Sequence, residues 1–496
     1  MSRYVHKYKM KNGNTAVRIM KKSGRELVGE EHIGVAHNEE ELNMYLILAR
    51  EKLKDEGQGE LKLFGEEKKT EIRQVRAYSK YLFDVIGGIY ERLKFKEVRD
   101  EVFKEITIAR IIEPSSKLES INVLTKLGLK APTDRQIHCS LKRVVERNYR
   151  EKVAKKCCEF VGIDETTLLL YDVTSLHFEI SKEDEYRKSG FSKERRLEPQ
   201  IIVGLLVDKK GFPLSINSFE GNKAETKTII PVLKRFKEEN AVKEITVVAD
   251  AGMLSASNLE QIEDEGYKFI VGSRISKVPY EIEEYRRKAN EELEDNQTFE
   301  GLQKINKNAK ERRVVYQYRQ KRADKDLRVI NDQIKKALLE IKYNKFSKKR
   351  KFIKITKMKK EIDEEKIKEA RLKAGIKGYV TNLDCKECDA KIVIDAYHNL
   401  FEVEKSFRMT KSDLQARPVF HQTRDSIEAH LTVCFAALAI SRYIQDKTKI
   451  SIKKFVQRLK ELRTGIVQIG DKQYTAEPVI DSDTERIVKL LQIWGS

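Results

Sequence analysis

The stretch between residues 166 and 272 constrains the fold more than any other part of this sequence. It holds five short apolar runs rich in β-branched residues, and helical patterns at 226–239 and 255–264 separate the last three of them. The first three runs are close enough to form an antiparallel meander, whereas the last two follow helices and can be parallel. We predict a mixed α/β fold with strands at 167–173, 201–208, 212–219, 245–250 and 268–272.

Two acidic residues come directly after apolar runs of this predicted sheet. Asp172 ends the first strand and Asp250 ends the fourth. Because the carboxyl ends of parallel strands lie along one edge, we expect both carboxylates at the edge where ligands bind. An Asp at a strand end is also a common turn former, so each residue alone has an ordinary explanation.

Residues 397–411, YHNLFEVEKSFRMTK, contain no Gly or Pro and are interpreted as one helix. On a helical wheel Glu404 lies at the margin of the apolar stripe, while Glu402 lies on the opposite side and is expected to face water. A carboxylate flanked by basic residues at a core margin suits a metal and phosphate site, although long charged side chains also border ordinary amphipathic helices. The apolar stripe comprises Leu400, Val403 and Phe407, and the charged stripe beside Tyr397 comprises Glu404, Arg408 and Lys411.

The charge of the chain indicates a polyanionic partner. Among 496 residues, 99 are Lys or Arg and 79 are Asp or Glu, which gives a net charge of +20 and a pI near 9.3. The hydrophobic content of 40% is enough for folded cores, and the length corresponds to about three domains. Nucleic acid is the expected partner.

No feature of the sequence indicates a membrane or a disulfide framework. The apolar run at 434–440 is too short for a span, and the N-terminus lacks an apolar signal core, so we expect a cytoplasmic protein. Cys385 and Cys388 form a CxxC pair, but neither Cys157 and Cys158 nor the scattered histidines complete a zinc site. Reduced structural thiols are the favoured interpretation.

The first 160 residues read as an α-rich module with a β start. Alternating basic and apolar residues at 4–33 predict a small meander, and helical patterns follow at 39–54, 80–93, 101–112, 116–127 and 134–147, the last with Thr133 as a possible cap. Specific recognition of DNA is the functional interpretation, and simple scaffolding is the alternative, because no helix-turn-helix spacing is evident.

A basic segment interrupts the later part of the chain. Residues 341–360 hold ten Lys or Arg and no acid, with Tyr343, Phe346 and Phe352 between them. Basic side chains with stackable rings suit a nucleic-acid track, and a solvated charged face is the alternative. The candidate phosphate contacts are Lys348, Lys349, Arg350 and Lys351.

The patterns suggest five regions. Residues 1–160 form the N-terminal module, 161–274 the first part of a catalytic core, 275–377 a basic insertion, 378–450 the second part of the core, and 451–496 a C-terminal tail region. Residues 378–384 read as a strand that returns to the sheet, and 430–443 as a buried helix that backs it.

Three carboxylates in a basic protein match the needs of two-metal phosphoryl transfer. Two Mg²⁺ ions about 4 Å apart would activate the attacking hydroxyl and stabilise the leaving oxygen. Hard cations take oxygen ligands, so Asp172, Asp250 and Glu404 need no His or Cys beside them.

The motifs YDVTS, VVADAGM and Y-x2-L-x3-E-x6-K, around Asp172, Asp250 and Glu404, resemble the DDE transposases of bacterial insertion sequences, in the branch with a Tyr-Arg-Glu-Lys signature. The likeness runs over about residues 166–444, and the EPSSKLES segment at 113–120 is also similar. It implies an α/β fold with an RNase H-like mixed-sheet core and a basic insertion. It also implies an upstream part that binds terminal inverted repeats, and cut-and-paste transposition with Mg²⁺, for which Mn²⁺ would substitute.

Carried over by the resemblance, Asp172, Asp250 and Glu404 would be metal ligands, and Tyr397 and Lys411 would contact DNA near the scissile phosphate. Leu400 stands where the signature has Arg. We hypothesise that Arg408, one turn beyond Glu404, supplies the missing phosphate contact.

The partners implied are double-stranded DNA, both the element's ends and the target, and a second copy of the chain in the DNA complex. Two alternatives remain open at this point. A structure-selective nuclease would share fold and metals without strand transfer, and a DNA-binding protein derived from a transposase would have lost catalysis.

Overall fold

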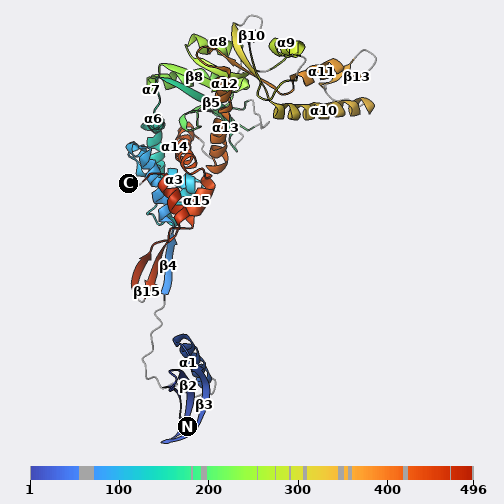
Figure 1. Cartoon of the computed structure of the whole chain (residues 1–496). Helices are drawn as coiled ribbons and strands as arrows, with labels where there is room; N and C mark the ends of the chain where they lie inside the picture. The colour runs from blue at the N-terminus through green and yellow to red at the C-terminus, as the bar shows by residue number, and fades with distance from the viewer. Residues whose placement is uncertain are drawn as a thin grey trace. The chain divides into compact units, whose positions relative to one another are not determined.

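The computed structural model describes residues 2–54, 72–179, 182–190, 198–253, 255–273, 275–289, 292–304, 310–343, 351–355, 360–416, 423–469 and 471–493. The chain divides into two compact units, shown in Figure 1. One comprises residues 1–73 with 468–473, and the other comprises residues 74–467 with 474–496.

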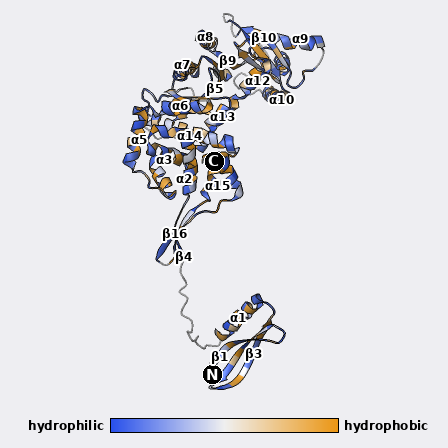
Figure 2. Cartoon of the chain, turned by 60° about the vertical axis from the view of Figure 1, so that its left-hand side comes forward, coloured by the Kyte–Doolittle hydropathy of each residue, from blue (hydrophilic) through white to orange (hydrophobic). Residues whose placement is uncertain are grey.

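The first unit contains the predicted meander. Strands β1 (Ser2–Lys9), β2 (Thr15–Ser23) and β3 (Glu26–Ala36) pair antiparallel in that order. Helix α1 (Glu39–Lys54) packs on them, and Val17, Ile19 and Ala49 form the buried centre. In Figure 2, α1 carries both hydrophilic and hydrophobic residues, as expected for a helix that buries one face.

The N-terminal part of the second unit contains four helices close to the predicted positions and a fifth, α6, that was not predicted. They are α2 (Lys80–Arg92), α3 (Glu101–Ile112), α4 (Lys117–Lys126), α5 (Asp134–Glu146) and α6 (Tyr149–Val161), with a short 3-10 helix η1 (Phe95–Val98). Thr133 caps α5 through a reciprocal capping box with Gln136. These helices share one core with α14 and the large sheet, so the helical part of the N-terminal region belongs to the same unit as the sheet.

A mixed sheet of eight strands forms the centre of the second unit within the described residues, in the order β10-β11-β14-β9-β8-β5-β6-β7. β5, β6 and β7 form the predicted antiparallel meander, and β8 and β9 continue parallel on the other side of β5. This meander followed by β-α-β units is the RNase H-like arrangement. The bounds are β5 Thr166–His177, β6 Gln200–Val207, β7 Pro213–Glu220, η2 Glu225–Lys227, α7 Ile229–Asn240, β8 Glu244–Ala249, η3 Ala251–Met253, α8 Ala256–Asp264 and β9 Lys268–Ser273.

The prediction that Asp172 ends its strand is wrong. The parallel ladder with β8 stops at the pair Leu170 and Val248, but β5 continues to pair antiparallel with β6 as far as His177 and Gln200. The antiparallel partner therefore extends the strand past the acid.

Part of the predicted insertion belongs to the sheet. β10 (Thr298–Lys304) and β11 (Glu311–Tyr318) pair antiparallel, and β11 joins β14 (Ile376–Thr381), the strand that returns to β9 as predicted. Helix α9 (Tyr280–Ala289) packs beside β10. The remaining elements, α10 (Gln320–Lys342), β12 (Ile353–Ile355), β13 (Lys360–Ile362) and α11 (Glu364–Lys373), enclose a small core of their own.

That small core changes the interpretation of the basic segment. Phe352 is 1% exposed and packs with Ile330 and Ile367, so it is a core residue and offers no face to a nucleobase. Tyr343 is exposed. Phe346, Lys348, Lys349 and Arg350 lie outside the described residues, whereas Lys351 lies within them.

The predicted helix at 397–411 is divided in three. α12 (Ala390–His398) and α13 (Leu400–Arg408) are separated at Asn399, and a π-helical turn covers Met409–Asp413. Asn is a weak helix former whose side chain competes for backbone hydrogen bonds, and the Glu402 N–H bonds to the Asn399 carbonyl only three residues back. Glu404 and Tyr397 therefore belong to different helices.

Helix α14 (Arg424–Thr448) confirms the predicted buried helix. By length and composition alone it could cross a membrane, but 94% of its most apolar window is buried, as in a core helix. The C-terminal region follows with α15 (Ile452–Lys460), β15 (Thr464–Ile469), β16 (Lys472–Ala476) and α16 (Ser482–Leu490). β15 and β16 form a small sheet with β4 (Ile72–Tyr78), and all six cysteines are free, in agreement with reduced thiols.

Candidate active site

Asp172 lies in β5, and Asp250 directly follows the adjacent parallel strand β8. The parallel ladder between β5 and β8 ends at the pair Leu170 and Val248, and each aspartate lies two residues beyond its member of that pair. The preceding Tyr171 points to the opposite face, where its hydroxyl donates to Thr228 at the start of α7. Side chains alternate along a strand, so Asp172 faces the side of the sheet on which α13 packs.

Glu404 completes the set from the helix above. α13 rests on β5 and β6 through its buried residues Val403 and Phe407, and Glu404 sits at the edge of this contact. All three carboxylates line one cleft of about 400 Å³. The other lining residues are Lys377, Tyr397, His398, Leu400, Phe401 and Val403.

The hydrogen bonds of the acids leave oxygens available for a cation. Asp250 Oδ1 accepts from the Ala251 N–H at 2.7 Å and from the Tyr397 hydroxyl at 3.0 Å. Asp250 Oδ2 and both oxygens of Glu404 accept no hydrogen bond from any residue that the structure describes. An all-oxygen donor set of this kind fits a hard divalent cation.

The carboxylates do not form a closed cage by themselves. Over the described ranges, no three His, Cys, Asp or Glu side chains gather closely enough to hold a metal ion, the CxxC pair included. Like charges repel at short distance, so we expect a cation to draw Asp172, Asp250 and Glu404 together.

Tyr397 holds Asp250 across an intervening strand. Its side chain is buried, and burial together with the neighbouring Asp250 raises the pKa of the phenol, so the hydroxyl stays protonated and donates. Strand β9 lies between β8 and β14, and a Cβ at Gly272 of β9 would come within 2.6 Å of the Tyr397 hydroxyl oxygen. A glycine in this strand permits the close approach.

Lys377 is a site residue that sequence reasoning missed. It precedes the predicted strand by one residue and was therefore assigned to the insertion. Burial lowers the pKa of Lys377, and Arg322 lowers it further, while Asp250 and Glu404 act in the opposite direction. The only available signal was a basic residue in the alternating run IKGYVT.

The predicted DNA-binding residues are placed in different environments. Tyr397 lines the cleft, and Lys351 lines a neighbouring cavity. Arg408, at the exposed end of α13, and Lys411, in the π-helical turn, are not among the residues that line the cleft. Leu400 is buried in its wall, as the wheel predicts.

A sequence profile of the family described as "Transposase DDE domain" matches residues 163–440, which is more than half of the chain and includes all three acids. This chain belongs to that family of transposases. The transposase is accordingly a polynucleotidyl transferase and endonuclease, the family generally uses a divalent metal ion, and DNA is its partner.

Comparison with other proteins adds little to this assignment. The cryo-EM structure of the piggyBac transposase synaptic complex with hairpin DNA is similar over 77% of this chain and 69% of that chain, with 9% identity and a TM-score of 0.37. No curated protein sequence matches the transposase.

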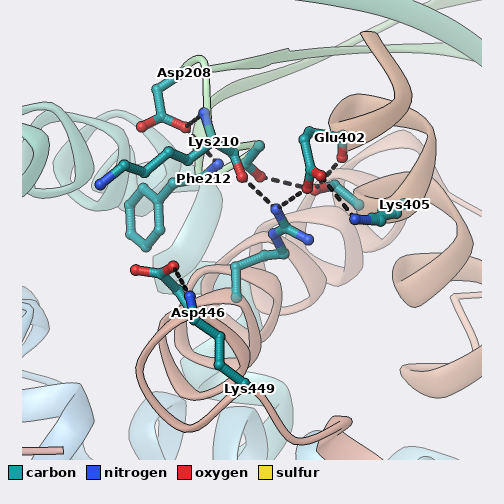
Figure 3. Close-up of polar contacts among 10 residues, drawn as sticks. Asp208, Lys210, Phe212, Glu402, Lys405, Asp446 and Lys449 are labelled. Carbon is teal, nitrogen blue, oxygen red and sulfur yellow. Dashed lines mark hydrogen bonds and ion pairs between the residues drawn. The ribbon is translucent and has the colours of Figure 1, made fainter. Parts of the chain in front are cut away.

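A clamp on α13 positions Glu404 in the transposase. Glu402, expected to face water, instead accepts from Arg442 of α14 at 2.8 Å and from Lys405 at 2.7 Å (Figure 3). Arg442 also donates to the Lys210 carbonyl in the turn between β6 and β7. The expectation fails because the wheel treats the helix as lying on the sheet alone, whereas α14 and this turn cover its second side.

The electrostatics of the clamp favour the ionised acid. Burial acts to raise the pKa of Glu402, but hydrogen bonds from Lys405 and Arg442 outweigh it, and the pKa lies below its usual value. One residue along the same turn, Gly211 accepts a hydrogen bond of 2.8 Å from Ser406 of α13 through its carbonyl. The helix that carries Glu404 is thus fixed at two points.

Proposed function

We propose that this transposase cuts and joins DNA at the ends of its own element, with Asp172, Asp250 and Glu404 as the ligands of two Mg²⁺ ions. The observation that supports this proposal is the common cleft of the three carboxylates, which come from two adjacent strands and one helix. When bound, the ions would activate the attacking oxygen and stabilise the leaving one.

The residues of the chain have separate tasks in this proposal. The Tyr397 hydroxyl and the Ala251 N–H both donate to Oδ1 of Asp250, and these two bonds fix the direction of Oδ2, which accepts no hydrogen bond from the described residues. Glu404 is held on a helix fixed by the Glu402 clamp. The net charge of +20 attracts the DNA backbone.

The finer assignment follows from the Tyr, Glu and Lys motif residues. We infer membership of the bacterial insertion-sequence branch, recognition of terminal inverted repeats by the region before residue 160, cut-and-paste transfer into target DNA, and action as a homodimer. We expect imperfect inverted repeats in the DNA that flanks the gene, and sequencing that DNA would supply the substrate for the test.

The test uses the full-length protein with a duplex that carries one such repeat. We expect cleavage that needs Mg²⁺ and is lost with EDTA, followed by joining of the 3′-OH end to a second DNA. Cleavage without joining supports a nuclease instead, and binding without cleavage supports an inactive DNA-binding protein.

Single substitutions test the site itself. Asp172→Asn, Asp250→Asn and Glu404→Gln should each abolish cleavage while binding to the repeat persists, because phosphate contacts elsewhere supply most of the affinity. A variant that cuts at the normal rate removes its residue from the metal site.

A further inference from the structure

The acid-lined cleft adjoins a second cavity, whose charged lining residues are mostly basic. This second cavity has a volume of about 550 Å³ and is lined in part by residues of α10 and α11. The two cavities share Asp250, Lys377 and Tyr397 in their walls. A basic cavity next to metal-binding carboxylates suits a polyanionic strand with one reacting phosphate. Its charged lining consists of Arg322, Lys351, Lys373 and Lys377 against Asp250 and Asp326.

Lys377 differs from an ordinary surface lysine. Its side chain is half-buried on β14, with Nζ 4.2 Å from the ring centroid of Tyr397 and 5.6 Å from that of Tyr379. The ammonium group of Lys377 makes no hydrogen bond or ion pair with any residue that the structure describes, although the charges of Asp250 and Glu404 act on it through space. Burying a cation without a carboxylate partner costs free energy, and a bound anion would offset that cost.

The two ring contacts offer a purely structural explanation, in which Lys377 stiffens the packing of Tyr397. Such cation–π contacts contribute about 0.5 to 2 kcal/mol. They do not explain why the ammonium group lies at the boundary of both cavities. They also leave the wall of the cleft without a replacement for the signature Arg, because Leu400 is apolar and Arg408 is not among the residues that line the cleft.

We propose that Lys377 binds a non-bridging oxygen of a DNA phosphate at the point where the basic cavity meets the acid-lined cleft, and so supplies the cation that is absent at Leu400. The strand continues along the second cavity past Arg322 and Lys351. This inference rests on the proposed function, since it concerns the same cleavage reaction. It makes β14, rather than the helix of Glu404, the source of the phosphate contact.

The experiment combines variants with modified DNA. Lys377→Met removes the charge, Lys377→Arg keeps it, and Lys391→Met removes a charge from an exposed lysine on α12 as the matched control. Each protein cleaves duplexes that carry one methylphosphonate at a time on the strand near the cleavage site. A methylphosphonate removes the charged oxygen of a single phosphate.

We expect Lys377→Met to cleave about 10- to 100-fold more slowly, the range for a charge-assisted hydrogen bond, and Lys391→Met to cleave as the wild type does. At one phosphate the methylphosphonate should slow the wild type but have no further effect on Lys377→Met. A merely structural lysine would give additive losses at every phosphate, which would overturn the proposal.

Three further outcomes have separate consequences. If Lys377→Met does not fold, Lys377→Arg provides the test. The proposal requires that the methylphosphonate slow Lys377→Arg most at the same phosphate as in the wild type. If cleavage by Lys377→Arg shows no such maximum, the proposal is overturned. If the three acid variants abolish cleavage but Lys377→Met cleaves normally, this inference fails and the proposed function stands. If the acid variants still cleave, the proposed function fails and this inference falls with it.

Discussion

The hydroxyl of Tyr397 donates a hydrogen bond of 3.0 Å to Oδ1 of Asp250. This bond links helix α12, which immediately precedes the helix of Glu404, to the end of β8. The first residue of the signature therefore contacts one of the proposed metal ligands directly. The resemblance implied a contact with DNA for the same tyrosine, and the two roles can be separated experimentally.

Tyr397→Phe keeps the ring and removes only the hydroxyl. Asp250 then loses one of the two donors that orient Oδ1, so we expect cleavage to slow roughly tenfold, the size expected for a hydrogen bond to a charged acceptor. Affinity for the DNA end should remain unchanged. A weaker affinity with an unchanged cleavage rate at saturating DNA would instead assign the hydroxyl to the DNA.

Gly272→Ala tests the same bond from the strand that Tyr397 crosses. The added methyl group would lie 2.6 Å from the hydroxyl oxygen and must displace it, so cleavage should fall at least as far as in Tyr397→Phe. The double variant should lie close to Tyr397→Phe, because the nearest atom is then absent and the ring carbons, at 3.1 and 3.2 Å from the added methyl group, need to shift by only a few tenths of an ångström. Gly465→Ala, where the nearest heavy atom outside the neighbouring residues is 3.9 Å away, is the control. Additive losses in the double variant would count against this explanation.

Local patterns predicted β5 to β9 and β14 of the sheet, but neither the full extent of β5 nor the strands β10 and β11. The alternation of apolar runs and helices identified the meander and the parallel strands, because each signal lies within a short window. The length of β5 past Asp172 depends on pairing with β6, which no single window contains. The joining of β10 and β11 to the same sheet depends on contacts distant in sequence in the same way.

The acidic residues of the candidate site could be predicted from the sequence, because carboxylates are the expected ligands of a hard cation. Asp172, Asp250 and Glu404 were identified from their positions and the motif, and they share a cleft. Lys377 and the Glu402 clamp were not, because each depends on how a third element, β14 or α14, packs against the site. A helical wheel describes how one helix packs against one surface, so it cannot show that a second element covers another side of the same helix.

Arg442→Met tests the clamp on α13. The side chain of Arg442 is 9% exposed, and its loss leaves the Glu402 carboxylate without its buried partner, so we expect a loss of about 3 kcal/mol in the free energy of unfolding and slower cleavage. Lys405→Met removes the more exposed partner of the same acid and should cost under about 1 kcal/mol. Equal losses in the two variants, measured by denaturant unfolding, would show that burial does not distinguish the two pairs.

The same acid predicts a dependence of stability on pH. The pKa of Glu402 is lower in the folded protein than its usual value of 4.5, so its contribution is present above that value and is lost as the pH falls through the folded pKa. The wild type should have a higher Tm than Glu402→Gln at pH 7, and the difference should shrink below about pH 4. A difference that stays constant from pH 7 to pH 3 would contradict the clamp's electrostatic role.

The basic segment at 341–360 contains Lys351, which lines the second cavity. If Lys348, Lys349, Arg350 and Lys351 follow the DNA backbone, replacing all four with Gln should weaken binding to unrelated sequences alike. Each lost phosphate contact should reduce the slope of log affinity against log salt by about 0.9. Replacing Lys351 alone should reduce the slope by the amount expected for one contact, because Lys351 and Lys377 line the same cavity, along the proposed path of the strand. The slope is measured by filter binding of the wild type and both variants between low and physiological salt. An unchanged slope in the fourfold variant would show that the segment is a solvated charged face.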